Sequence, residues 1–184
     1  MAKIYVFLAD GCEEIEALTP VDIFRRAGED VTTVSVMGRE DVTGSHGITV
    51  RADKKIEDEA FEDGDLLFLP GGMPGTLNLG ANEKLKNLIL SYHSQGRRLA
   101  AICAAPSVLG ALGVLEGKEA VCFPGFEEKL TGATVLEKPA VTSGNVTTGR
   151  GMGAAVDFAL EVLTQLQGAE TARQMAEKIV YPYA

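Results

Sequence analysis

Hydrophobic residues in this chain fall into two alternating patterns, short continuous runs and helically spaced faces. The continuous runs cover residues 3–8, 65–69 and 98–102. Runs of this kind are typical of parallel strands that are buried on both faces. The helically spaced faces lie between and after these runs, at residues 15–24, 83–95, 108–113, 149–166 and 169–179. The alternation predicts strands that are connected by helices.

Weaker patterns complete the expected order of elements. Residues 31–37 are predicted to form a second strand, and residues 38–50 a small hairpin or an edge excursion. Short strands are expected at residues 120–123 and in the segment 135–148, where Ser143, Gly144 and Asn145 form a turn. Pro20 interrupts the first helical face, so that helix is either kinked there or restarts with Thr19 as its N-cap.

The alternation as a whole predicts a single α/β domain over residues 1–184. Its expected architecture is a flavodoxin-like, doubly wound sandwich, with a mostly parallel central sheet and helices on both faces. In such folds ligands bind at the carboxyl ends of the strands. Three loops should lie at that edge, namely residues 10–16, 70–76 and 103–107. We therefore expect the functional residues in these loops.

Composition narrows the possible partners and the compartment. The 184 residues carry a net charge of −9 without any basic block, which argues against binding to nucleic acid or to an anionic membrane. No apolar run approaches the ~20 residues that a membrane span needs, and the sequence enters a strand directly, without a signal peptide. The three cysteines, Cys12, Cys103 and Cys122, have neither zinc nor disulfide spacing. These features predict a cytoplasmic protein with free thiols.

Cys103 is the candidate nucleophile, because it lies where a strand gives way to a helix. The free N–H groups and the positive end of a helix dipole lower a thiol pKa and favour the reactive thiolate. This arrangement resembles a nucleophile elbow without its flanking glycines. The alternative is a buried cysteine that serves only in packing, and local sequence does not separate the two interpretations.

The two other loops offer groups that can act beside a thiol. Of Glu13, Glu14 and Glu16, one carboxyl near Cys103 can be protonated and donate a hydrogen bond to the thiolate. The alternative is a solvated first helical turn, where acidic residues are favoured by the helix dipole.

The Gly-Gly pair at residues 71–72 permits close approach of the backbone. The N–H group of Gly72, together with that of Ala104, can form an oxyanion site. The alternative is a tight turn with Pro70 and Pro74.

Other polar residues are less informative on their own. His46 and His93 are the two histidines, and neither is next to Cys103 in the sequence. Arg150 can bind an anion, contribute to a dimer contact or simply be an exposed arginine. Cys12 and Cys122 are interpreted as packing residues, although Cys12 adjoins the acidic loop, where a secondary redox role is the less favoured alternative.

Taken together, several motifs resemble those of the DJ-1/ThiJ/PfpI superfamily, especially the branch of DJ-1 and bacterial ThiJ-like proteins. The segments, in chain order, are GCEEIE (11–16), LPGG (69–72), AICAAP (101–106), TGRG (148–151) and DFAL (157–160). The resemblance covers nearly the whole chain. It implies the flavodoxin-like fold, a homodimer, and activity without a cofactor or a metal.

The resemblance also implies roles for particular residues. Cys103 would be the reactive cysteine and Glu16 its protonated partner, with the N–H groups of Gly72 and Ala104 facing the sulfur. Arg26 and Arg150 would lie at or near the dimer interface.

Activities in the family include glyoxalase, deglycase, oxidative-stress sensing, chaperone and, in some branches, peptidase activity. The expected partner of the site is therefore a small aldehyde or an oxidant.

Two departures from the family pattern affect the expected chemistry. Relatives often have a histidine where this chain has Phe123, and peptidase-like members have one directly after the cysteine, where this chain has Ala104. A complete Cys–His–acid triad is therefore not expected, which disfavours amide hydrolysis. The favoured hypothesis is a Cys103–Glu16 pair that acts on small reactive carbonyls. The alternative is a redox sensor or chaperone in which Cys103 is oxidised to a sulfinate without turnover.

Overall fold

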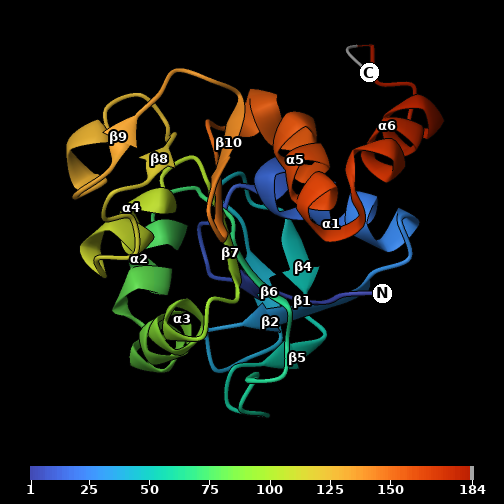
Figure 1. Cartoon of the computed structure of the whole chain (residues 1–184). Helices are drawn as coiled ribbons and strands as arrows, with labels where there is room; N and C mark the ends of the chain where they lie inside the picture. The colour runs from blue at the N-terminus through green and yellow to red at the C-terminus, as the bar shows by residue number, and fades with distance from the viewer. Residues whose placement is uncertain (183–184) are drawn as a thin grey trace.

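A seven-stranded sheet forms the centre of the protein, in a computed structural model that describes residues 1–182 (Figure 1). The strand order is β10-β11-β7-β6-β1-β2-β5, and every neighbouring pair is parallel except β10 with β11. The strands are β1 (Lys3–Leu8), β2 (Asp30–Ser35), β5 (Lys54–Lys55), β6 (Leu66–Leu69), β7 (Arg98–Ile102), β10 (Ala140–Ser143) and β11 (Val146–Gly149). The core order β2-β1-β6-β7-β11 is the flavodoxin-like order, which confirms the predicted fold class.

Helices cover both faces of the sheet. On one side lie α1 (Glu14–Arg26), α5 (Ala155–Gln167) and α6 (Ala169–Lys178), and on the other α2 (Gly75–Ala81), α3 (Glu83–Ser94) and α4 (Pro106–Ala111) (Figure 1). Short 3₁₀ turns are η1 (Glu127–Lys129) and η2 (Met152–Ala154). Two small sheets pair β3 (Asp41–Thr43) with β4 (Thr49–Arg51) and β8 (Glu119–Ala120) with β9 (Thr134–Val135). None of the helices within residues 1–182 is long and apolar enough to cross a membrane.

The side chains of the continuous apolar run of β1 pack into two separate hydrophobic cores, one on each face of the sheet. Tyr5 and Phe7 point into the core beneath α2, α3 and α4, whereas Ile4 and Val6 point into the core beneath α1, α5 and α6. Successive side chains of a strand point to opposite faces, so a strand that is covered on both sides needs apolar residues at every position. This is why the continuous runs in the sequence mark the central strands.

Most predicted elements are confirmed, including the hairpin of β3 with β4 and the turn between β10 and β11. The alternative in which the first helix restarts at Thr19 is wrong, because α1 is a single helix that contains Pro20. The strand expected at residues 120–123 is shorter and earlier, at β8, and it pairs outside the main sheet. The helix α2 and the edge strand β5 were not predicted from the sequence.

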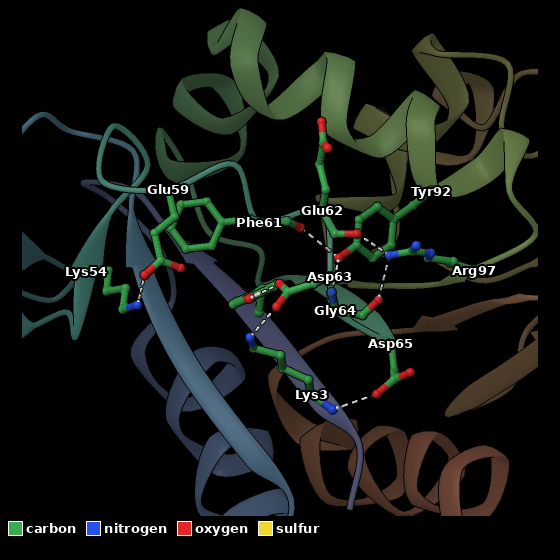
Figure 2. Close-up of polar contacts among 11 residues, drawn as sticks. Lys3, Lys54, Glu59, Phe61, Glu62, Asp63, Gly64, Asp65, Tyr92 and Arg97 are labelled. Carbon is green, nitrogen blue, oxygen red and sulfur yellow. Dashed lines mark hydrogen bonds and ion pairs between the residues drawn. The ribbon is translucent and has the colours of Figure 1, made fainter.

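The connection that leads into β6 is held against α3 and the residue before β7 by polar contacts, which Figure 2 shows. The hydroxyl of Tyr92 donates a hydrogen bond to the Phe61 carbonyl at 2.8 Å and accepts one from the Gly64 N–H at 2.9 Å. The Arg97 guanidinium donates to the carbonyls of Glu62 and Gly64. Because β6 ends in the glycine loop at the opposite edge, these contacts help to fix where that loop begins.

Replacing Tyr92 by phenylalanine should destabilise the fold by about 2 kcal/mol, because it leaves a buried carbonyl and a buried N–H without a partner. Urea unfolding, followed by circular dichroism, measures the loss. Tyr181→Phe is the matched control, because it removes a hydrogen bond to Asp157 at a partly exposed site. Equal losses in the two variants would contradict this account of the connection.

Candidate active site

Cys103 occupies a sharp backbone turn directly after β7. Its φ angle is +65°, in the left-handed region that residues with a side chain rarely adopt. Hydrogen bonds fix the turn on both sides, because the Cys103 N–H donates to the Gly149 carbonyl at 2.9 Å and its carbonyl accepts from the Phe123 N–H at 2.8 Å. The residue is 9% exposed. Such an over-determined, strained residue is typical of functional sites.

Two glycines allow the acidic loop to approach this turn closely. A Cβ atom at Gly71 would lie 2.5 Å from Glu16 Oε2 and 2.6 Å from Cys103 Cβ. At Gly72, whose φ is +90°, it would collide with the backbone of Glu13 and Gly11. Gly71 therefore lies between the carboxyl and the cysteine, and any side chain there would separate the two segments.

The three acidic residues of the loop have three different surroundings. Glu13 caps α1, since its carboxylate accepts a hydrogen bond from the Glu16 N–H at 2.7 Å. Glu14 accepts hydrogen bonds from the backbone N–H groups of His46 and Ile48 and so holds the hairpin. Glu16 is 1% exposed and lies beside Cys103. Of the three, Glu16 is therefore the carboxyl in contact with the thiol.

Burial raises the pKa of Glu16 to about 7. The charge of Glu13 acts in the same direction, whereas the Cys103 thiol and the N–H groups of Gly71 and Met152 stabilise the charged form and oppose it. One carboxyl oxygen, Glu16 Oε2, is buried without a hydrogen-bond partner among residues 1–182. This carboxyl can hold or release a proton near neutral pH.

The net shift of the Cys103 pKa is opposite to the one that the helix start alone predicts. Burial, and after it the charge and hydrogen bonding of Glu16, raise the pKa of Cys103 to about 12. The N–H groups of Gly72 and Ala104 do stabilise the thiolate, as expected, but they are outweighed. Because two adjacent buried negative charges are unfavourable, a thiolate can form at low cost only while Glu16 carries the proton.

Neither histidine contacts Cys103 within the described part of the chain. His46 is mostly exposed, and its Nδ1 lies 3.0 Å from Glu14 Oε2. His93 is in the last turn of α3, before β7 begins, whereas Cys103 follows the other end of that strand. A five-residue strand separates the two ends of β7 by about 17 Å. The Cys–His pair that a peptidase requires is therefore not formed within this subunit.

Glu13, Glu14 and His46 also place three potential metal ligands within 4.8 Å of one another. The Glu14 carboxylate in this group already accepts hydrogen bonds from His46 and Ile48. The cluster is accounted for as an ion pair that anchors the hairpin.

A cavity of about 530 Å³ lies on the far side of Gly151 from Glu16; its lining includes Phe123, Arg150 and Met152 but neither Cys103 nor Glu16. At Gly151 a Cβ atom would lie 3.2 Å from the Phe123 ring and 3.9 Å from Glu16 Oε1, so this glycine connects the cavity to the thiol–carboxyl pair. Sequence reasoning missed Met152, whose N–H stabilises the Glu16 carboxylate. The cluster of glycines around it, at residues 149, 151 and 153, was the available signal.

The other candidate residues lie outside the thiol–carboxyl pair. Arg26 is about 15 Å further along α1 than Glu16 and pairs with Asp22 at 2.5 Å. Arg150 lines the cavity. The two arginines therefore do not lie together beside Cys103. Cys12 and Cys122 are buried free thiols whose pKa values burial raises to about 11. Their surroundings agree with the interpretation as packing residues.

Comparisons of this chain with family models, with curated proteins and with solved structures agree with one another. The model of the DJ-1/PfpI family matches residues 2–165. Protein DJ-1 homolog B of Arabidopsis thaliana is 38% identical over 180 residues, which are 97% of this chain and 41% of that protein. The chain thus spans less than half of that relative.

Two further relatives match over most of their own length. A deglycase of Pyrococcus abyssi is 31% identical over 151 residues, covering 80% of this chain and 89% of that protein. Among solved structures, oxidised DJ-1 of Toxoplasma gondii superimposes with a TM-score of 0.96 and 35% identity over the full length of both chains.

Proposed function

This chain belongs to the DJ-1/PfpI family, and from that membership and the paired Cys103 and Glu16 we propose that it converts small reactive carbonyls without a cofactor. The observation that carries the proposal is the buried carboxyl beside the thiol, whose pKa burial raises to about 7. The deglycase among its relatives supports carbonyl chemistry of this type. We further propose that the protein is a cytoplasmic homodimer, as the family resemblance implies.

The reaction begins on the form of the pair in which Glu16 holds the proton and Cys103 is the thiolate. The sulfur attacks the aldehyde carbon of a 2-oxoaldehyde, and the carbonyl oxygen takes the Glu16 proton, which gives a hemithioacetal. The N–H groups of Gly72 and Ala104 stabilise negative charge that develops on oxygen during the attack. Glu16, now a carboxylate, is placed to act as a base in the next step.

The second part of the reaction moves one proton between adjacent carbons. Glu16 removes the hydrogen from the former aldehyde carbon, which gives an enediol, and returns a proton to the neighbouring carbon. The hydroxyl proton on the first oxygen passes to the oxygen of the second carbon, so the first carbon is oxidised to the thioester level and the second is reduced to an alcohol. The product is a thioester of Cys103, and water cleaves it to a 2-hydroxy acid and the free thiol. Overall, one oxoaldehyde and one water give one 2-hydroxy acid.

Purified protein should convert methylglyoxal to lactate without added glutathione, which an enzymatic lactate assay measures. Since the thiol of the protein replaces glutathione as the nucleophile, the rate should depend linearly on protein concentration. A rate equal to that of buffer alone would contradict the proposed function.

A second candidate function is oxidation sensing, and the surroundings of the sulfur favour it. The N–H groups of Gly72 and Ala104 and a protonated Glu16 can all donate hydrogen bonds to a sulfinate on Cys103. The relative from Toxoplasma gondii was solved in a form described as oxidised. In this function the modified cysteine would be the signal, without any turnover.

Mild peroxide treatment should add two oxygen atoms to Cys103 and leave Cys12 and Cys122 unmodified, which peptide mass spectrometry measures. The expected selectivity follows from the hydrogen-bond donors around Cys103, which stabilise the sulfinate product. Equal modification of all three thiols would argue against a site tuned for oxidation.

A further inference from the structure

The cavity beside Glu16 is larger than a two- or three-carbon aldehyde requires. Its volume of about 530 Å³ is in the range of sites for whole small molecules. The proposed reaction involves only two adjacent carbonyl carbons, which would lie at the sulfur and the carboxyl. The remaining space can therefore hold a substituent on the reacting carbonyl group.

Apolar side chains form the part of this cavity nearest to Glu16. Phe123 is 48% exposed and Met152 is 53% exposed, so both side chains present apolar surface to the cavity. Phe123 is held by the Cys103 turn, since its N–H donates to the Cys103 carbonyl. Gly151 packs between the Phe123 ring and Glu16, since a Cβ atom there would lie 3.2 Å from the ring and 3.9 Å from Glu16 Oε1, so a single glycine separates the ring from the carboxyl. A substituent on a carbonyl that is bound at Cys103 can therefore reach the ring.

The charged residues around the cavity largely cancel one another. Two acids, Glu137 and Asp157, face two bases, Lys138 and Arg150. Asp157 also accepts a hydrogen bond from the Tyr181 hydroxyl at 2.8 Å. With balanced charges at its rim, the cavity has no strong preference for an anionic or a cationic substituent. The apolar wall therefore decides the preference.

We propose that this cavity selects 2-oxoaldehydes with an uncharged aromatic or branched apolar substituent, and that Phe123 is the specificity-determining residue. This inference rests on the proposed carbonyl chemistry at Cys103. The substituent packs between Phe123 and Met152, while the two carbonyl groups lie at Cys103 and Glu16. Phe123 offers an aromatic face to the substituent.

The test compares phenylglyoxal with methylglyoxal as substrates of the wild type and of Phe123→Ser. The ratio of their kcat/KM values should fall about tenfold in the variant, because an aromatic contact is lost for one substrate and not for the other. Leu90→Ser is the matched control, since Leu90 is an exposed apolar residue of α3 outside the cavity. The control should retain the wild-type ratio. Met152→Ser should shift the ratio in the same direction as Phe123→Ser.

Binding without chemistry provides an independent measurement. Acetophenone should bind to Cys103→Ser more tightly than acetone in saturation-transfer NMR, and Phe123→Ser added to that variant should remove the difference. If acetophenone binds in this way but neither aldehyde is converted, the carbonyl chemistry fails and the apolar preference stands. If both aldehydes are converted and Phe123→Ser leaves their ratio unchanged, the apolar preference is overturned and the chemistry stands.

The competing occupant of the cavity is a side chain from a second copy of this protein. Sedimentation velocity of the wild type and of Phe123→Ser distinguishes the two. An unchanged oligomeric state in the variant supports a substrate pocket. Dissociation of an oligomer on this substitution would overturn the proposal, because the apolar wall would then be part of a subunit contact.

Discussion

Cys103→Ser is expected to lower kcat/KM for methylglyoxal by at least about 1,000-fold, because covalent catalysis is lost when a hydroxyl replaces the thiol. A serine hydroxyl at this position has no histidine to activate it. Its ionisation beside a buried carboxyl is even less favourable than that of the thiol. Methylglyoxal turnover measured at pH 7.5, with circular dichroism to confirm folding, tests the prediction.

Cys122→Ser is the matched control for this substitution. Cys122 is also a buried thiol, and burial raises its pKa as well, but it does not contact Glu16 in the structure. The control should retain turnover within about twofold of the wild type. If both variants retained the wild-type rate, Cys103 would not be the nucleophile and the proposed function would fail.

Glu16→Gln is expected to lower kcat/KM at pH 7 by about 100-fold to 1,000-fold, the usual contribution of a general acid and base. Glutamine has nearly the shape of the carboxyl and can donate a hydrogen bond, but it cannot accept and return the substrate proton. Glu83→Gln makes the same chemical change at the exposed start of α3 and should leave the rate unchanged.

The pH profile distinguishes this role from a structural one. In the wild type, kcat/KM should rise through pH 7, because the pair loses its first proton there and the species with one negative charge is the active one. In Glu16→Gln the first ionisation is that of the thiol, whose pKa burial raises, so the ascending part of the profile should move to higher pH. A profile that still rises near pH 7 in the variant would exclude Glu16 as the titrating group.

Stability should change in the opposite direction to activity. The folded pKa of Glu16, about 7, lies above its value of about 4.3 in an unfolded chain. A group of this kind contributes stability that is fully present below the unfolded pKa and is lost as pH rises through the folded one. Glu16→Gln loses nothing over that interval, so its melting temperature should fall less than that of the wild type between pH 5 and pH 8.

The local sequence was informative wherever burial dictates residue type. The apolar runs that became β1, β6 and β7 could be recognised because both faces of these strands are covered. β5 was missed because it consists of Lys54 and Lys55 and exists only through its pairing with β2. α2 was missed because its seven residues include glycines and an asparagine, and it is stabilised by packing of Leu79 in the core.

The candidate site could be located from the sequence, but its electrostatics could not. Three loops at the carboxyl ends of parallel strands are expected to meet, and the loops that carry Glu16, Gly71 and Cys103 do so. The sign of the thiol pKa shift depends on how deeply these loops bury one another, which is a property of the tertiary structure. The extent of the cavity depends likewise on Gly151 and Met152, which lie after β11.

The central position of β6 between β1 and β7 has a consequence for how the protein folds (Figure 1). Each of these strands reaches its neighbour through a long crossover, so the chain must close large loops before the pairs form, which slows folding. The loops that carry Glu16, Gly71 and Cys103 come together only when all three strands are in register. Recovery of catalysis after dilution from urea should therefore coincide with the last step of sheet assembly, and the enzyme assay then serves as a folding probe.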